Sequence, residues 1–190
     1  MTKILNKIQN YTVLDSEIIQ DVEYKKRKNS YFDINNTIYY WTLLMHAVDC
    51  EREELVEYLL EDFDVDVNYK DNDSYTALLL SCYNDDVPIL KLLLGHMDIN
   101  VNIQNNYVWT VLHEACYNNY IEYVKELLLD ARVDVLIRTD QGETAQDIAI
   151  REGRSGIANM IKKTGHTSLL RIPNASLCRD ITRMIIEEYT

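Results

Sequence analysis

Aromatic and acidic residues recur along this chain in columns spaced 34 residues apart, and these columns are where the sequence could do chemistry. They hold both tryptophans and five of the 14 tyrosines. Aromatic faces attract cations and give a protein partner a large rigid contact, and acidic neighbours favour the same cationic, partly apolar ligand. The candidate partner-binding residues are Tyr39, Trp41, Asp49, Asp73, Tyr75, Tyr83, Asn84, Tyr107, Trp109, Tyr117 and Asn118.

The same rings have an alternative, structural use. Because the surrounding turns are poor in glycine and proline, rings that pack on one another could stiffen them. For Trp41 in particular, the sequence leaves open that the indole covers the join to the preceding segment. The sequence gives the columns but not the distances between rings, so both uses stay open.

Patterns typical of catalysis or metal binding are scarce. The chain has no glycine-rich phosphate loop, HExxH, CxxC or nucleophile elbow. The four cysteines lack ligand spacing; we expect no disulfide among them, and we expect Cys82 and Cys116 to pack in the core. The four histidines are dispersed. The sequence therefore predicts no enzyme, no catalytic residue, no cofactor and no metal site.

The formal charge of −12 is concentrated in the middle of the chain. Residues 37–150 carry 6 basic and 22 acidic side chains, whereas the segments on either side are close to neutral. An acidic block disfavours nucleic acid as a partner, because carboxylates and phosphates repel. No run approaches the ~18 apolar residues of a membrane span, and the N-terminus lacks a signal-peptide core. We expect neither a nucleic-acid nor a membrane partner.

Four threonines, Thr42, Thr76, Thr110 and Thr144, set the register of the columns at intervals of 34 residues. A small residue lies five positions after each threonine, and a second apolar run begins thirteen positions after it. The i, i+1, i+4, i+5 spacing of that run is typical of an amphipathic helix. The pattern thus predicts that each unit consists of a turn, a short helix, a longer helix and an extended connector. The apolar faces of the helices are expected to be buried by stacking on neighbouring units.

The repeated unit resembles the ankyrin repeat, whose pattern is Asp-x-x-Gly-x-Thr-Pro-Leu-His-x-Ala. The best matches are residues 110–115 (Thr-Val-Leu-His-Glu-Ala) and residues 142–149. Proline after the threonine is absent from all four repeats, the turn glycine survives as Gly142 alone, and the helix-start histidine survives as His113 alone. These departures predict lower stability and a shifted hairpin-tip geometry within the same fold.

The resemblance implies an all-α ankyrin-repeat solenoid of stacked helix-turn-helix units with short hairpin-like connecting loops. Its predicted parts are a degenerate N-terminal capping repeat at 1–36, four repeats at 37–70, 71–104, 105–138 and 139–163, and a C-terminal capping helix or tail at 164–190. Within the tail, Leu177, Ile181, Met184 and Ile185 have the spacing of one helix face.

In the ankyrin family the hairpin tips and the ends of the inner helices line a concave groove, and the aromatic columns fall on those positions. The resemblance thus implies a non-enzymatic protein-protein interaction module, expected to bind a basic protein or peptide in an acidic aromatic groove. An alternative is a reader of methylated lysine, because some ankyrin-repeat proteins similarly use aromatic cages beside acidic residues. The candidate cage residues are Tyr75, Tyr83, Trp109 and Tyr117, with Asp73 or Glu114.

The stretch 177–183 (Leu-Cys-Arg-Asp-Ile-Thr-Arg) is loosely similar to the core of the SOCS box, which follows ankyrin repeats in some ubiquitin-ligase adaptors. Its isoleucine falls one place early, and Asn174 stands where the SOCS box has leucine. This similarity leaves open an adaptor that recruits a ubiquitin-ligase component. The low content of glycine, alanine and proline suggests an AT-rich genome. Viruses and intracellular pathogens with such genomes often carry ankyrin-repeat proteins, so a host-directed effector is left open as an alternative. We expect an intracellular location, in the cytoplasm, the nucleus or a host cell's cytoplasm.

Overall fold

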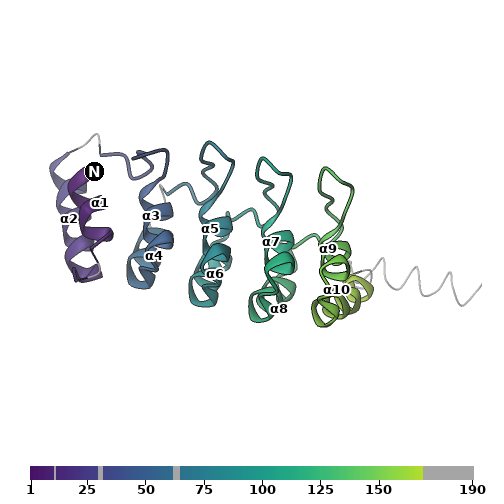
Figure 1. Ribbon diagram of the computed structural model, residues 1–190. Coiled ribbons are helices and arrows are strands. Elements are labelled where there is room, and N and C mark those ends of the chain that lie inside the picture. Colours follow the sequence, from purple (N-terminus) through teal and green to yellow (C-terminus); the bar gives the residue numbers. More distant parts are fainter. Residues whose placement is uncertain (11, 30–31, 62–64, 169–190) are drawn as a thin grey trace, which may run out of the picture.

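The computed structural model describes residues 1–10, 12–29, 32–61 and 65–168, with side chains described as far as residue 164. In this part of the chain there are ten helices and no strand. They form five pairs that follow one another along the stack (Figure 1). The helices are α1 (Thr2–Ile8), α2 (Asp15–Lys28), α3 (Leu43–Asp49), α4 (Glu53–Leu60), α5 (Ala77–Tyr83), α6 (Val87–Gly95), α7 (Val111–Asn118), α8 (Ile121–Leu129), α9 (Ala145–Arg151) and α10 (Ser155–Ser168).

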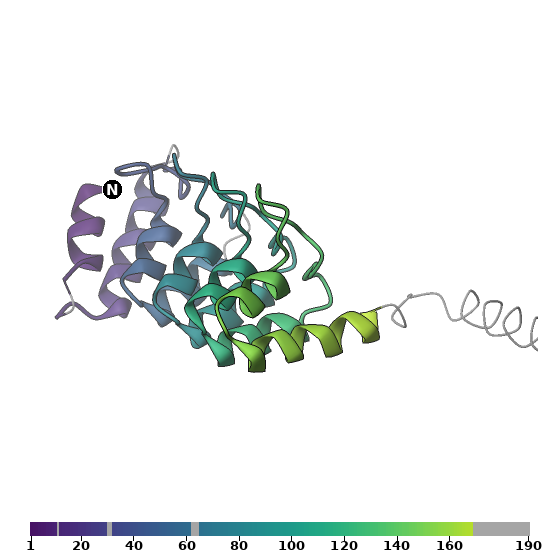
Figure 2. The same cartoon turned by 45° about the vertical axis from the view of Figure 1, so that its right-hand side comes forward.

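The five pairs stack in two parallel rows. The odd-numbered helices form an inner row and the even-numbered helices an outer row, and each helix contacts its pair partner and its neighbours in the row. The loops before α3, α5, α7 and α9 project on the same side of the stack, as the turned view shows (Figure 2). The prediction of an all-α repeat solenoid is therefore confirmed.

The threonine column explains where the inner helices begin. Oγ1 of Thr42 and Oγ1 of Thr76 each accept the backbone N–H three residues on, at 3.3 Å. Thr144 does the same at 3.2 Å, and its own N–H donates back to the carboxylate of Asp147 at 2.9 Å. At Thr110 the backbone N–H donates to Nδ1 of His113 at 3.2 Å. Caps of this kind stabilise a helix by about 1 kcal/mol, which matters in helices this short.

Small residues let the inner helices pack closely. The residue five positions after each threonine is fully buried, and it is alanine or serine. In the second repeat this residue, Ser81, has its Oγ 2.7 Å from the hydroxyl of Tyr123, which lies fully buried in α8. This contact joins the inner helix α5 to the outer helix of the next repeat.

Asparagines in the connectors between repeats link each connector to the next one along the stack. Asn68 donates to the carbonyl of Asp98 at 2.7 Å and accepts the backbone N–H of Asn100 at 2.8 Å. Asn102 makes the same two bonds one repeat further on, at 2.8 and 2.9 Å. Because these bonds satisfy backbone groups of the neighbouring connector, each repeat fixes the position of the next.

Left-handed backbone recurs at two positions in every repeat. The angle φ is positive two residues before each threonine and again nine residues after it. The last repeat has glycine at both positions, Gly142 and Gly153, but the first three repeats hold the same conformation with other residues. The missing turn glycines therefore add backbone strain in repeats one to three.

Two side chains close the second and third hairpins from within. Oδ1 of Asp71 accepts the backbone N–H groups of Asp73 and Tyr75 at 2.9 and 2.8 Å. Oδ1 of Asn105 accepts the equivalent groups of its own hairpin, both at 3.0 Å. These bonds hold the aromatic residue before each threonine in a fixed place relative to the inner helix.

The N-terminal pair α1 and α2 is fixed to the first repeat by the Arg52 guanidinium. It donates to the carbonyls of Ile8, Asn10 and Val13 at 2.7 to 3.1 Å and to Oδ1 of Asp15 at 3.2 Å. The Arg52 and Asp15 side chains are about nine-tenths buried, with 10% and 11% of their surface exposed. The Arg52 side chain thus holds the end of α1, Asn10, Val13 and the start of α2 together.

Candidate protein-binding surface

The predicted site residues lie on three equivalent segments, each made of a hairpin, an inner helix and the turn after it. We call the surface of these segments, residues 37–51, 71–85 and 105–119, the hairpin face. The segments contain six carboxylates and no lysine or arginine. These carboxylates belong to Asp49, Glu51, Asp71, Asp73, Asp85 and Glu114. These three segments therefore carry acidic charge and no basic charge of their own, and Arg151 of the last repeat interacts electrostatically with Tyr117 at their edge.

Aromatic side chains pair within a repeat. The ring before the threonine meets the ring at the end of the inner helix, with centroids 5.5 Å apart for both Tyr75–Tyr83 and Trp109–Tyr117. The two tyrosine hydroxyls are also 2.8 Å apart. In the last repeat, Arg151 and Glu143 occupy the same two positions and form an ion pair of 2.9 Å.

These pairs give the rings two roles. Tyr75 and Trp109 are half-buried and join the hairpin to the helix, so part of their surface serves the scaffold. Their partners Tyr83 and Tyr117 keep 56% and 45% of their surface exposed. The exposed members therefore offer a partner the larger surface.

Trp41 has a structural contact that its column position does not reveal. Its indole N–H donates to Oδ2 of Asp71 in the next hairpin at 2.9 Å, and its ring lies 5.4 Å from the imidazole of His46. The indole thus bridges repeats one and two. Asp49, at the end of α3, is exposed.

The hairpin tips carry the most exposed rings. Tyr39 is 81% exposed and Tyr107 is 67% exposed, and Asp73 occupies the equivalent tip position between them. Beside Tyr39, Tyr40 is 64% exposed, and both tyrosines have positive φ in a two-residue turn closed by Ile38 and Trp41. Tyr40 is not among the residues that the sequence predicts for the surface, because it stands at the position of the turn glycine. The two consecutive tyrosines are the signal that could have drawn attention to it.

The two asparagines of the set have part of their side chains engaged. The amide of Asn84 donates to the backbone carbonyl of Asp49 in the preceding repeat at 3.3 Å. The amide of Asn118 donates to the carbonyl of Glu114 at 3.1 Å. Both residues are exposed, and they directly follow Tyr83 and Tyr117 in the chain.

Glu114 is a half-buried carboxylate of the hairpin face, as is Asp71. Burial raises its pKa, against hydrogen bonds from Asn105 and Tyr75 that lower it. Nδ2 of Asn105 lies 3.3 Å from Oε1. Burial also raises the pKa of the Tyr75 hydroxyl, and Tyr83 and Glu114 add to this effect. Within the described part of the chain, no lysine or arginine forms an ion pair with Glu114.

The three described cysteine thiols, which could act as nucleophiles or metal ligands, are buried. Cys82 and Cys116 lie in the core, and burial raises the pKa of both thiols, that of Cys116 to about 12. Cys50 is buried as well, and all three thiols are free. Among the described residues no group of three histidine, cysteine, aspartate or glutamate side chains is placed to hold a metal ion. Cys178 and the SOCS-box-like stretch lie outside the described residues.

Comparison with protein families identifies the repeat. A model of ankyrin repeats in three copies matches residues 15–105, and a model of ankyrin repeats in many copies matches residues 92–149. The two matches together span residues 15–149, and the chain belongs to the ankyrin-repeat family. A comparison with curated proteins found no match.

Family membership gives the general function. Ankyrin repeats are protein-protein interaction modules and are generally non-enzymatic, so this chain is a protein-binding repeat protein. No helix in the part of the chain that the structure describes has the length and apolar character needed to cross a membrane.

Proposed function

We propose that the hairpin face binds a basic segment of a partner protein. The observation that carries the proposal is the combination of six carboxylates with no lysine or arginine on segments that also present exposed aromatic rings. A cationic segment is attracted to this face as a whole, and its lysine or arginine side chains then stack on the rings.

The rings and the carboxylates have separate tasks in this proposal. Tyr83 and Tyr117 are already oriented by their partners Tyr75 and Trp109, so binding immobilises few additional side chains. Asp49 and Asp73 are exposed and act mainly on the rate of association and its salt dependence. Glu114 is partly desolvated, so an ion pair with it contributes more than a pair at the rim.

The test is a selection of short random peptides displayed on phage against the full chain. We expect the selected peptides to be enriched in lysine and arginine together with apolar residues. The binding variant Tyr83→Ala/Tyr117→Ala is expected to lose these peptides. The matched control Tyr24→Ala removes a tyrosine that is 62% exposed on α2, away from the hairpin face, and is expected to keep them.

A second pair of variants separates charge from shape. Asp49→Asn/Asp73→Asn/Glu114→Gln neutralises three carboxylates of the hairpin face and is expected to weaken binding and its salt dependence. The variant Glu53→Gln/Glu54→Gln/Glu57→Gln changes the net charge equally on the outer helix α4 and is expected to bind like the wild type. Enrichment of neutral or acidic peptides, or equal loss in both triple variants, contradicts the proposal.

Recognition of methylated lysine is the second candidate, favoured by one observation. Glu114 lies beside Tyr75, whose ring pairs with Tyr83, so one carboxylate and two rings converge between repeats two and three. A selected peptide is synthesised with lysine or trimethyl-lysine at one position, and both affinities are measured. A cage reader prefers the methylated form, whereas equal affinity dismisses this candidate and leaves plain charge recognition.

A further inference from the structure

Glu114 differs from the residues that occupy its position in the other repeats. Four residues after each threonine, the inner helices carry His46, Leu80 and Ile148, and all three of these side chains are buried. Two of the other repeats thus fill the position with an apolar side chain. The third repeat instead places a half-buried carboxylate there, on the hairpin face.

Neighbouring side chains hold the carboxylate of Glu114 in place. Nδ2 of Asn105 lies 3.3 Å from Oε1, while Oδ1 of the same asparagine accepts two backbone N–H groups of its hairpin. The Tyr75 hydroxyl of the preceding repeat also donates to the carboxylate, and it lies 2.8 Å from the Tyr83 hydroxyl. The carboxylate is therefore oriented before a partner arrives, beside the Tyr75–Tyr83 ring pair.

Both of these donors are neutral, so they do not balance the negative charge of Glu114. Burial raises the pKa of Glu114, which means that folding holds its ionised form at a cost. Asp71, the other half-buried carboxylate of the hairpin face, accepts two backbone N–H groups and the Trp41 indole N–H. A carboxylate has about four acceptor positions, so Glu114, with two donors, keeps room for a ligand.

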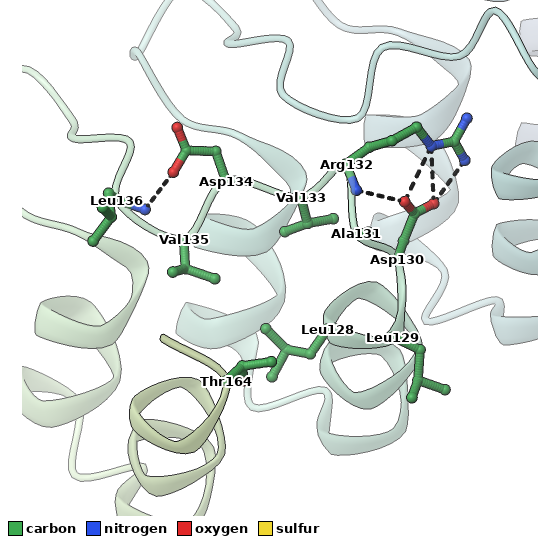
Figure 3. Close-up of a pocket in the computed structure, with 10 residues that line it drawn as sticks. All are labelled: Leu128, Leu129, Asp130, Ala131, Arg132, Val133, Asp134, Val135, Leu136 and Thr164. Atoms are coloured by element: carbon green, nitrogen blue, oxygen red, sulfur yellow. Dashed lines mark hydrogen bonds and ion pairs between the residues drawn. The ribbon is translucent and has the colours of Figure 1, made fainter. Parts of the chain in front are cut away.

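A groove of about 470 Å³ near the end of the described chain offers a cation no equivalent place (Figure 3). It lies between the connector that follows α8 and the adjoining ends of α8 and α10. Its carboxylates already have partners, because Asp130 pairs with Arg132 at 2.6 Å and Oδ1 of Asp134 accepts the backbone N–H of Leu136 at 2.9 Å. The remaining lining is mostly apolar.

We propose that Glu114 is the specificity-determining residue of the hairpin face and takes one cationic side chain of the partner segment, an ammonium or a guanidinium. This inference rests on the function proposed above and adds one fixed position to it. The cation supplies the positive charge that the half-buried carboxylate lacks, and its apolar stem lies against the exposed ring of Tyr83. A partly desolvated pair discriminates more sharply than the exposed carboxylates at the hairpin tips.

The test is a double-mutant cycle between Glu114 and the charges of one basic peptide selected as described above. Each lysine or arginine of the peptide is replaced in turn by neutral norleucine or citrulline, and dissociation constants are measured for the wild type and Glu114→Gln. We expect one position whose neutralisation weakens binding to the wild type about tenfold and leaves binding to Glu114→Gln unchanged, because these two groups pair. Exchanging lysine and arginine at that position then distinguishes an ammonium from a guanidinium.

The matched control Asp73→Asn removes the same charge from an exposed hairpin tip. It is expected to bind every peptide more weakly and to keep the tenfold effect of the coupled position. If each neutralisation costs the same affinity in the wild type and in Glu114→Gln, this inference is overturned while recognition of a basic segment stands. If no basic peptide is selected at all, the proposed function fails and this inference fails with it.

A stability measurement separates binding from a structural role. Glu114→Gln keeps an oxygen for the Asn105 amide and removes the charge, so its midpoint of urea unfolding is expected to equal or exceed that of the wild type. A clearly lower midpoint would assign the charge to the scaffold and overturn the proposal.

Discussion

At the scale of single residues, the hairpins combine strained backbone with side-chain bonds that hold it. Val108 has φ of 61° at a position where the last repeat has Gly142, and left-handed backbone is least favourable for a β-branched residue. Asn105 holds this loop through bonds to two backbone N–H groups. The sequence reveals the missing glycine, whereas the compensating bonds appear only in the structure.

Val108→Gly is expected to stabilise the protein by roughly 0.5–1 kcal/mol. The relief of left-handed strain, about 1–2 kcal/mol, exceeds the entropy that glycine adds to the unfolded chain. Urea unfolding measures the change. The reverse substitution Gly142→Ala, at φ of 77°, is expected to destabilise the protein, and a destabilised Val108→Gly protein contradicts this account of the hairpin.

At the scale of elements, the N-terminal pair depends on a contact made across the sequence. The sequence predicts two helices in residues 1–36 from their apolar spacing, and α1 and α2 form there. It does not predict that Arg52 fixes the turn between them, because the bonded residues lie 37 to 44 positions away. A single contact between residues this far apart in the sequence leaves no periodic pattern from which it could be predicted.

Arg52→Ala is expected to release α1 and α2 from the stack. Removing the guanidinium takes away its hydrogen bonds to Asp15 and to three carbonyls, and breaking a buried charged pair costs about 3–5 kcal/mol. Hydrogen exchange should show lost protection in α1 and α2, with protection kept in α5 to α8. Arg138→Ala removes an arginine whose side chain is 62% exposed and is expected to leave the exchange pattern unchanged. Unchanged protection in the Arg52 variant contradicts the assigned role.

At the scale of the whole molecule, the 34-residue period was sufficient to predict the stack. Each unit buries its apolar face against its neighbours, so a period visible in the residue types implies the two rows of helices. The candidate site is different. The sequence predicts columns of rings, but the structure pairs Tyr75 with Tyr83 and Trp109 with Tyr117 inside a repeat. Which rings pair depends on the distance between the hairpin and the end of the inner helix, and this distance cannot be read from the positions of the aromatic residues in the sequence.

The central claim is that the exposed members of these pairs, on an acidic face, bind a basic partner segment. The measurement that tests it most directly is the dissociation constant of one selected basic peptide for the wild type and for Tyr83→Ala/Tyr117→Ala, at low and at moderate salt. We predict at least a roughly tenfold loss of affinity in the variant, unchanged affinity in Tyr24→Ala, and weaker binding by the wild type as salt rises. Equal affinities of the wild type and the double variant would mean that the rings serve the scaffold alone, and would contradict the claim.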